Sequence, residues 1–395
     1  MEYKIIHLPK DEWKGYVIPM EYTANNYYDV KITQNTKGFR VGFTKKSHKT
    51  PFVRSWLDNP NPQDFLYADW WEKAWAWGVV EDGRLKAVIE TVPEEWSNRL
   101  RITELWVEKD LRGKGVVKRL MNIAKEQARL ERRRAIILET QSCNENAIGF
   151  YLSQGFSLIG FDACCYSNRD IKNKEVRLEL GYFLPEKNKL KRKDILIRHE
   201  VPSDYYNTEL MVRRAFWNLH RPGCDEHLLV SKLRTDNAYL PGLSRVAEVD
   251  GKIAGFIMYC LSHVETPDGR LEEVLTFGPL AVDPEFQNSG IGGYLIEETT
   301  RQAAKEGYRG IIIFGEPDYY PRHGFVTSDK FNITTYDGKN FAAFMTKELV
   351  KGGLSGIRGR FVIPPVYESL TEDETAEFDK NFPPADKIKF PFHWS

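Results

Sequence analysis

Apolar residues follow two different periods along this chain, and each period predicts its own kind of element. Residues 135–138 and 311–314 are continuous apolar runs, which are typical of strands covered on both faces. In residues 291–306, apolar positions such as Ile291 and Leu295 recur at helical spacing, with charged residues on the other side. The pattern therefore predicts an α/β or α+β fold, in which a mixed central sheet is flanked by helices.

The two halves of the chain repeat one longer pattern in the same order. Each half has a strand-like run, a turn with glycine, an amphipathic helix, a second buried strand, and an aromatic pair followed by Gly-Phe. In the first half these segments are 102–107, 112–115, 117–129, 135–139 and 150–156, and in the second half they are 274–282, 287–290, 291–306, 310–314 and 319–325. Because order and spacing both recur, we interpret the chain as a tandem duplication of one domain.

The length of 395 residues agrees with this interpretation, since a single domain usually has about 100–200 residues. Residues 184–194 are highly charged and nearly free of apolar side chains, so we expect an exposed linker there. The predicted organisation is a first domain over 1–185, a charged linker over 186–194, and a second domain with a C-terminal extension over 195–395. Solvation is the favoured explanation of the linker's lysines, and phosphate binding is the alternative.

The balance of charges limits the classes of partner. The chain has 56 Lys and Arg against 56 Asp and Glu, so no overall attraction to nucleic acid or to an anionic membrane is expected. A local basic patch is compatible with this balance. The first residues lack a secretory apolar stretch, and no apolar run approaches the roughly 20 residues of a membrane helix. Five cysteines without a C-x-x-C pair argue against a disulfide framework or a zinc site. We expect a cytoplasmic protein without a metal.

A strand that leads into a glycine turn and then a helix is suited to hold a phosphate, because free N–H groups and the positive helix end face the anion. Both halves have such a turn. The predicted phosphate-binding residues are Arg112, Gly113, Lys114, Gly115, Val116 and Val117 in the first half, and Gln287, Asn288, Ser289, Gly290, Ile291, Gly292 and Gly293 in the second. Neither turn matches the P-loop or the dinucleotide fingerprint, so ATP and dinucleotides are not favoured. A helix start that only needs glycine is the alternative.

Tyr151 and Tyr320 occupy the same place in the aromatic pairs of the two halves. A phenol, with a pKa of about 10, can donate a proton to a departing thiolate of similar basicity. The alternative is that both are core aromatic residues. We favour the chemical role, because the tyrosine recurs together with the glycine turn.

The glycine turn after a strand, followed by Tyr-x-x-x-Gly-Phe, resembles the GNAT family of N-acetyltransferases, and the resemblance covers most of both halves. The first half is similar to the streptothricin acetyltransferase group in the segments 96–98, 112–115, 138–141, 144–147 and 150–151. The second half is similar to uncharacterised bacterial N-acetyltransferases in the segments 222–227, 277–282, 319–325, 344–345 and 354–359.

This resemblance implies an enzyme, an acyltransferase that transfers an acetyl group from acetyl-CoA to a primary amine. It also implies that the strand before each turn separates from its neighbour, and that the pantetheine arm lies in the gap. Backbone contacts to that arm are then expected from Leu105, Trp106, Val107, Leu280, Ala281 and Val282. On this view the turns bind the pyrophosphate, Tyr151 and Tyr320 protonate the thiolate, and Asn144 bonds the pantetheine or a water.

The group that takes the proton from the attacking amine differs between the halves. Glu104 lies three residues before Val107, where the family often has an acidic residue, and a carboxylate can accept this proton directly or through water. The equivalent position in the second half is Pro279, which cannot serve. There we expect the base among Glu226, His227 and Glu273. The alternatives are a water-exposed strand carboxylate in the first half, and loop or helix-cap residues in the second.

Val117 departs from the family pattern, which has glycine or alanine at this position, as Gly292 does in the second half. A β-branched side chain there could crowd the pyrophosphate, so we expect weaker coenzyme binding in the first domain. The leading functional hypothesis is acetylation of a small, cationic amine by direct attack. Acetylation of a protein or peptide amine is one alternative, and a coenzyme-binding regulatory module with degenerate domains is another.

Tryptophan gathers in the first half, where eight of the ten lie within the first 106 residues. With acidic groups, these rings could line a pocket for a cationic amine, and ordinary packing is the favoured alternative. Cys143 is discounted as a nucleophile, because the sequence places no histidine beside it. After Arg360 the chain is expected to pack at 361–363 and then to form a surface extension.

Overall fold

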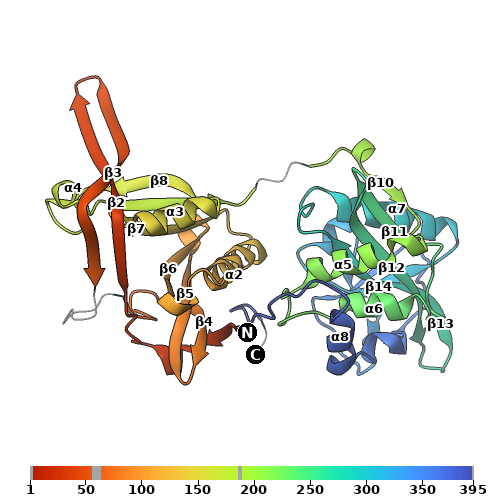
Figure 1. The fold of residues 1–395 in the computed structure, drawn as a ribbon. Coiled ribbons are helices and arrows are strands. Elements are labelled where there is room, and N and C mark those ends of the chain that lie inside the picture. The colour runs from red at the N-terminus through yellow and green to blue at the C-terminus, as the bar shows by residue number, and fades with distance from the viewer. Residues whose placement is uncertain (1–2, 56–63, 186–188, 394–395) are drawn as a thin grey trace. The chain divides into compact units, whose positions relative to one another are not determined.

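The computed structural model describes residues 3–55, 64–185 and 189–393 and divides the chain into two compact units. Unit 1 comprises Met1–Pro185 together with Ile388–Pro391, and unit 2 comprises Glu186–Lys387 together with Phe392–Ser395. Each unit is built on its own mixed sheet with helices against it (Figure 1). The predicted fold class is therefore confirmed.

Unit 1 contains a seven-stranded sheet, whose neighbouring strands are antiparallel except for one central parallel pair, β6 and β7. In spatial order the strands are β1 (Ile6–Leu8), β4 (Trp75–Glu81), β5 (Arg84–Glu94), β6 (Arg99–Val107), β7 (Ala135–Gln141), β9 (Arg177–Phe183) and β8 (Ser157–Asp162). The helices are α1 (Lys10–Trp13), α2 (Val116–Leu130), α3 (Glu145–Ser153) and α4 (Asp170–Asn173). The strands predicted at 102–107 and 135–139 and the helix predicted at 117–129 are confirmed, each slightly longer than expected.

Helix α2 connects the two parallel strands and packs on the sheet, because its apolar residues recur every three or four positions. Leu120, Ala124 and Ala128 are fully buried. They cluster with Ile136 and Leu138 of β7. Helix α2 begins at Val116, shortly after β6 ends at Val107, and the predicted turn lies between them.

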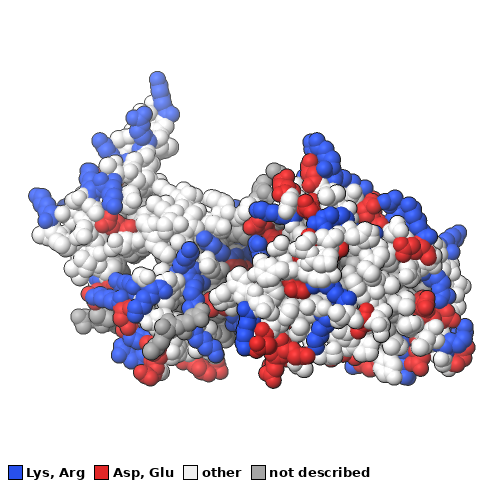
Figure 2. Space-filling view, turned by 45° about the vertical axis from the view of Figure 1, so that its right-hand side comes forward, with Lys and Arg blue, Asp and Glu red and all other residues white. Residues whose placement is uncertain are grey.

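A long two-stranded ribbon, β2 (Glu21–Asn35) and β3 (Gly38–Ser55), forms a separate sheet of unit 1 that the sequence pattern did not predict. Its base is anchored by packing of buried Val30 on β9 and by a hydrogen bond from Asn26 to Glu145 of 2.8 Å. The outer residues 31–42 are exposed, and the Phe39 side chain is 81% exposed. Residues 31–49 include Lys and Arg but no Asp or Glu, and Figure 2 shows these cations along the ribbon. A local basic patch is thus present in a chain without net charge.

Unit 2 has a nine-stranded sheet with the same central arrangement as unit 1. In spatial order its main path is β10 (Leu196–Arg198), β11 (Arg245–Val249), β12 (Lys252–Glu265), β13 (Leu271–Val282), β14 (Gly310–Phe314), β17 (Phe344–Glu348) and β15 (Val326–Thr327), with β16 (Ile333–Thr334) and β18 (Gly359–Val362) attached to it through β12. The helices are α5 (Tyr205–Phe216), α6 (Glu226–Leu233), α7 (Ile291–Lys305) and α8 (Glu372–Asp379). Strands β13 and β14 are parallel and α7 connects them, so the repeat read from the sequence has one order of elements in both units.

The predicted linker is described from Lys189 onward, and its residues 186–188 lie outside the described part of the chain. Residues 192–194 form a short 3₁₀ turn. Lys191 and Lys193 are exposed, as expected of a solvated segment. Leu190 and Ile195, however, pack against the core of unit 2, so the segment is attached to this unit.

Residues 388–390 correct one expectation, since they are not a surface extension. Ile388 is 2% exposed and Phe390 is fully buried in the core of unit 1. The Trp77 indole donates a hydrogen bond to the carbonyl of Lys389 at 3.0 Å, and the rings of Trp77 and Phe390 meet edge to face at 5.6 Å. The short apolar pattern Ile-Lys-Phe is too brief to be recognised in the sequence, although its alternation fits a segment that buries every second side chain.

Candidate active sites

In each unit the two central parallel strands separate soon after they begin. Strands β6 and β7 are paired only from Arg99 to Arg101, although β6 continues to Val107. Strands β13 and β14 are paired only at Leu275 and Ile311, although β13 continues to Val282. Beyond these pairs, the inner edge of each strand faces a gap, and within the described residues its backbone N–H and C=O groups have no partner strand there. An extended ligand can therefore add to either edge by backbone hydrogen bonds.

An irregularity in the preceding strand pair accompanies each separation. In unit 1 the register between β5 and β6 shifts at Thr103, and in unit 2 the register between β12 and β13 shifts at Gly278 and Pro279. Thr103 and Gly278 lie at the same distance before Val107 and Val282. A bulge increases the local twist of a strand, which is a physical reason for β6 and β13 to turn away from their parallel partners.

The turn at the end of each strand depends on left-handed backbone conformations. Gly115 and Gly290, the residues directly before α2 and α7, have φ of +82° and +103°. The second turn position is also left-handed in both units, with φ of +75° at Gly113 and +65° at Asn288. Glycine and asparagine are the residues that adopt this conformation most readily, which explains their recurrence in the sequence.

Each turn directs backbone N–H groups toward the space beyond the helix. The first helical hydrogen bonds run from Arg119 to Gly115 and from Tyr294 to Gly290, both at 3.1 Å. The N–H groups of residues 116–118 and 291–293 precede these bonds, so they have no carbonyl partner within their helices. Such a helix start attracts an anion, and it lies where the sequence predicts phosphate binding.

The first residue of each turn motif has a bracing role that sequence reasoning missed. The Arg112 side chain donates a hydrogen bond to the carbonyl of Val107 at 3.2 Å. The Gln287 side chain donates to the carbonyl of Val282, also at 3.2 Å. Arg and Gln both supply a long side chain with an N–H donor, which explains why either can fill this position. They hold the turn against the end of the strand.

The third position of the turn motif is Gly292 in unit 2 and Val117 in unit 1, and the aromatic residue beside it differs as well. A Cβ atom on Gly292 would lie 2.7 Å from the Tyr319 hydroxyl. In unit 1 the corresponding residues are Val117 and Phe150, and both pack against the unit's core. Because phenylalanine lacks the hydroxyl, unit 1 has room for a β-branched side chain where unit 2 requires glycine.

We expect Gly292→Val to destabilise unit 2 by about 1–3 kcal/mol, because the added carbons meet the Tyr319 hydroxyl. Tyr319 cannot move freely, since its ring packs against Tyr320 and His323. Thermal unfolding followed by circular dichroism measures the loss. Adding Tyr319→Phe should restore part of it, and a double variant no more stable than Gly292→Val would contradict the explanation.

The acidic and phenolic residues predicted in unit 1 lie close together. The Tyr151 side chain is 8% exposed and packs against Phe150 and Phe156. Burial raises the pKa of Tyr151, and the negative charge of Glu104 raises it further. Glu104 is partly exposed on β6, before the end of the separated strand. A proton donor and a proton acceptor therefore lie near the same gap.

Glu104 is surrounded by further carboxyl groups. Burial raises its pKa well above the usual range, and Asp64, Glu90 and Glu139 add to this effect. Glu90 lies directly opposite Glu104 across β5 and β6, and its carboxylate accepts hydrogen bonds from the Tyr67 N–H at 2.6 Å and the Thr103 hydroxyl at 2.7 Å. Glu104 has no such bond among the described residues. Its carboxylate is left available for a ligand.

Two other residues considered from the sequence have structural contacts. Asn144 caps α3, with its side-chain oxygen accepting a hydrogen bond from the Ala147 N–H at 3.3 Å. Cys143 is buried beside the Tyr22 hydroxyl at 3.3 Å, and burial raises the pKa of its thiol. A thiol of this kind is not activated as a nucleophile.

Among the described residues of unit 1, the tryptophans do not form one cage. Trp77 is fully buried, whereas Trp70 and Trp96 are 62% and 85% exposed. The cation–π contacts are made by the chain itself, with Arg99 over Trp96 at 5.5 Å and Arg101 over Trp71 at 5.9 Å.

In unit 2 the corresponding tyrosine is Tyr320, which begins a short 3₁₀ turn. Its ring packs against Phe277 and Phe325, and burial raises its pKa. A side chain at Gly315 would overlap this ring, since an added Cβ would lie 2.2 Å from it. The Tyr320 ring is therefore held beside β13.

The predicted bases of unit 2 lie at the start of α6. His227 is fully buried, with one ring nitrogen 3.6 Å from the Cys224 sulfur and the other 3.0 Å from Asp379. Burial lowers its pKa to about 4. Full burial removes His227 from the candidates for a base. Glu226 is partly exposed, and burial raises its pKa to about 7.

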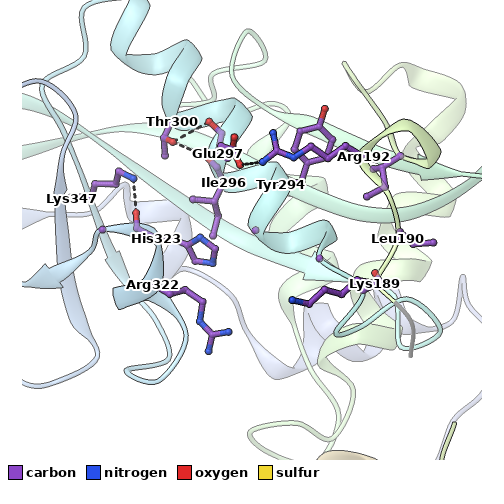
Figure 3. A pocket seen from close by; sticks show the side chains of 15 residues that line it. Lys189, Leu190, Arg192, Tyr294, Ile296, Glu297, Thr300, Arg322, His323 and Lys347 are labelled. Carbon is purple, nitrogen blue, oxygen red and sulfur yellow. Dashed lines mark hydrogen bonds and ion pairs between the residues drawn. The ribbon is translucent and has the colours of Figure 1, made fainter. Parts of the chain in front are cut away.

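A cationic pocket of 610 Å³ in unit 2 adjoins the turn before α7 (Figure 3). Its walls come from the turn, from the described part of the linker, from residues 322–324 and from β17. The charged residues that line it are Lys189, Arg192, Glu297, Arg322 and Lys347. Of these cations, the sequence indicated only those of the linker as an alternative phosphate site, because the others come from distant segments.

Two family models match the chain. The model of the acetyltransferase (GNAT) family matches residues 43–156, and the model of the acetyltransferase (GNAT) domain matches residues 241–327. Together they cover just over half of the chain. The chain belongs to the GNAT acetyltransferase family. The tandem GNAT domains and the enzyme class predicted from the sequence are thereby confirmed.

Several known proteins are similar to parts of this GNAT chain. The uncharacterised N-acetyltransferase YjhQ of Escherichia coli K12 is 36% identical over 99 residues, which are 25% of this chain and 53% of YjhQ. A streptothricin acetyltransferase of Escherichia coli is 31% identical over 112 residues, which are 28% of this chain and 64% of that protein. The chain thus spans about half to two thirds of the length of these relatives.

Among solved structures, the GNAT N-acetyltransferase YhbS of Escherichia coli in complex with CoA aligns with 48% of this chain and 98% of its own. The TM-score is 0.40 and the sequence identity is 23%. In the part of the chain that the structure describes, no helix is long and apolar enough to span a membrane, and no cluster of His, Cys, Asp and Glu could hold a metal ion.

Proposed function

We propose that this chain transfers an acetyl group from acetyl-CoA to the primary amine of a small, cationic molecule by direct attack. The observation that carries the proposal is the same in both units. A separated strand edge, the free N–H groups of a helix start and a buried tyrosine lie around one gap. These groups suit the three parts of the donor, which are the pantetheine arm, the pyrophosphate and the departing sulfur.

In unit 1 the proposed chemistry needs one proton acceptor and one proton donor. Glu104 accepts a proton from the bound ammonium group, directly or through water, and the free amine then attacks the thioester carbonyl. As the carbon–sulfur bond breaks, Tyr151 donates its phenolic proton to the leaving thiolate. The nitrogen of the adduct loses its second proton to water as the amide forms, the tyrosinate recovers a proton from solvent and Glu104 returns its own proton to solvent, so that the products are the acetylated amine and the free thiol. The strand edge at Leu105–Val107 and the N–H groups of residues 116–118 hold the donor.

The surroundings of Glu104 support a cationic acceptor. Asp64, Glu90 and Glu139 lie near enough to Glu104 to raise its pKa, and Glu139 also forms ion pairs with Arg101 at 3.8 Å and Arg177 at 3.5 Å. A polar gap of this kind favours an ammonium ion over a neutral or acidic group. Because its pKa is raised, the deprotonated Glu104 is also a stronger base than an ordinary carboxylate.

Unit 2 has the donor-binding features, and its candidate base comes from a different position in the chain. We infer that Tyr320 is the acid there, with Leu280–Val282 and the N–H groups of residues 291–293 holding the coenzyme. Pro279 replaces the carboxylate at the position of Glu104. Glu226, with a pKa of about 7, is the candidate that remains of the pair at the start of α6.

The test of the proposed function is the release of coenzyme A thiol from acetyl-CoA in the presence of amines. Small diamines and polyamines are expected to give rapid release, and lysine-containing peptides of similar charge are expected to give much less. Faster reaction with the peptides would support the protein acetyltransferase alternative. Binding of acetyl-CoA without release by any amine would support the regulatory alternative.

Tyr320→Phe separates the contributions of the two units. If unit 1 catalyses the acetylation, this variant should keep most of the activity toward its amine, and Tyr151→Phe should lose roughly a hundredfold or more in kcat. Steady-state thiol release measures both. Equal activity of Tyr151→Phe and the unmodified protein would contradict the assignment of Tyr151.

A further inference from the structure

The linker is attached to the phosphate-binding turn of unit 2. The Leu190 N–H donates a hydrogen bond to the carbonyl of Ser289 at 2.9 Å, directly before Gly290. Two residues later, the Arg192 guanidinium lies over the Tyr294 ring at 5.0 Å and forms an ion pair with Glu297. Figure 3 shows this segment beside the first turns of α7. The linker thus forms one wall of the pocket that adjoins the turn.

Positive charge exceeds negative charge around this pocket. Lys189, Arg192, Arg322 and Lys347 line it, and Glu297 is the one carboxylate among its lining residues. Two of these cations have backbone contacts, since Arg322 donates to the Asp318 carbonyl at 2.9 Å and Lys347 donates to the His323 carbonyl at 2.5 Å. Carbonyl groups do not neutralise a cation. A pocket of 610 Å³ with this excess is suited to an anionic group larger than a simple ion.

His323 adds a polar atom that has no partner in the described structure. Its Nε2 is buried without a hydrogen bond. Its ring lies against the start of α7, where a Cβ atom on Gly293 would be 3.0 Å from the imidazole. Burial and the nearby Arg322 and Lys347 lower the pKa of His323, so the ring is neutral near pH 7 and can donate one hydrogen bond. A phosphate oxygen would give this ring the partner it lacks.

We propose that residues 189–192 of the linker belong to the coenzyme site of unit 2, and that the cationic pocket receives the 3′-phosphate of coenzyme A. The inference rests on the proposed function, in which the turn at residues 287–290 holds the pyrophosphate. The 3′-phosphate is a separate phosphomonoester on the same molecule, and it carries up to two negative charges. The cations share the pocket with Ser289 and Gly290 of the turn, so they can meet this second anionic group. Binding of the coenzyme then adds a further contact to the attachment of the linker on unit 2.

Dephospho-CoA tests this inference, because it has the pyrophosphate and pantetheine of coenzyme A but lacks the 3′-phosphate. Calorimetry on the full chain should show about tenfold tighter binding of coenzyme A than of dephospho-CoA. In the double variant Lys189→Gln/Arg192→Gln most of this preference should be lost. The matched control is Lys191→Gln/Lys193→Gln, which removes the same charge from exposed linker residues that do not line the pocket. The control should keep the preference.

Limited digestion with trypsin gives an independent measurement on the unmodified chain. Trypsin cleaves after Lys and Arg, so mass spectrometry of the fragments reports cleavage at residues 189–193. Coenzyme A should slow this cleavage severalfold, and dephospho-CoA should need a clearly higher concentration for the same effect. Unchanged cleavage, or a preference that persists in Lys189→Gln/Arg192→Gln, would overturn the inference. Tight but equal binding of both compounds would overturn it and leave the proposed function standing, whereas failure of both to bind would remove both.

Discussion

Glu104→Gln is expected to lower kcat/KM for the amine at neutral pH by at least about a hundredfold, because glutamine cannot accept the proton of the ammonium group. The exposed carboxylate Glu81 at the end of β4 provides the control, and Glu81→Gln should retain full activity. Steady-state thiol release measures both variants. If the acetylation of unit 1 uses another base, Glu104→Gln will keep its rate, and the proposed mechanism fails while the family assignment stands.

The pH profile adds a sharper expectation for the same residue. A base acts in its deprotonated form, so kcat/KM should rise with pH through the pKa of Glu104 and then level off. Because burial and the neighbouring carboxylates raise this pKa, the rise should lie well above the pH range of an ordinary glutamate. Glu139→Gln removes one of the neighbouring charges and should move the rise to lower pH. Glu104→Gln should abolish this part of the profile.

Phe390→Ala is expected to destabilise unit 1 by about 3–5 kcal/mol, since it removes a fully buried aromatic ring from the core. Chemical denaturation followed by tryptophan fluorescence is the appropriate measurement. Eight of the ten tryptophans lie within the first 106 residues, so this signal reports mainly on unit 1.

Phe392→Ala is the matched control for this expectation. It makes the same chemical change two residues later, where the side chain is 39% exposed. Its cost should be less than about 1 kcal/mol. If Phe390→Ala unfolds at the same denaturant concentration as the unmodified chain, the C-terminal segment does not belong to the folded core of unit 1.

The parts of the fold that depend on local periodicity could be predicted from the sequence. The helix at 291–306 and the strand at 310–314 have enough apolar positions to define their period, and the structure places them within one residue of these bounds. The ribbon β2–β3 could not be predicted in this way, because its outer half is exposed on both faces and has no buried side to impose a pattern. The segment of Ile388 and Phe390 was missed for another reason. Its burial depends on Trp77, more than three hundred residues earlier in the chain.

In the candidate sites, too, the features set by local sequence could be predicted, and those set by packing between distant segments could not. Gly115 and Gly290 could be recognised because a left-handed turn position restricts the residue type. The partnership of Gly292 with Tyr319 could not, since the close approach of a hydroxyl to one Cα depends on packing between distant segments. His227 looked like a base because histidine has a suitable pKa in water. Its complete burial beside Cys224 and Asp379 is a property of the folded unit.

The position of Ile388–Pro391 in unit 1 has a consequence for how the chain is made. The N-terminal residues leave the ribosome first, and most N-terminal domains can fold while the rest of the chain is being synthesised. Here the core around Trp77 lacks two of its buried side chains until almost the whole chain has been synthesised. Unit 2 has nearly all of its residues by that time. Unit 1 can therefore complete its core only after residues 388–391 have left the ribosome, when nearly all of unit 2 has already been synthesised.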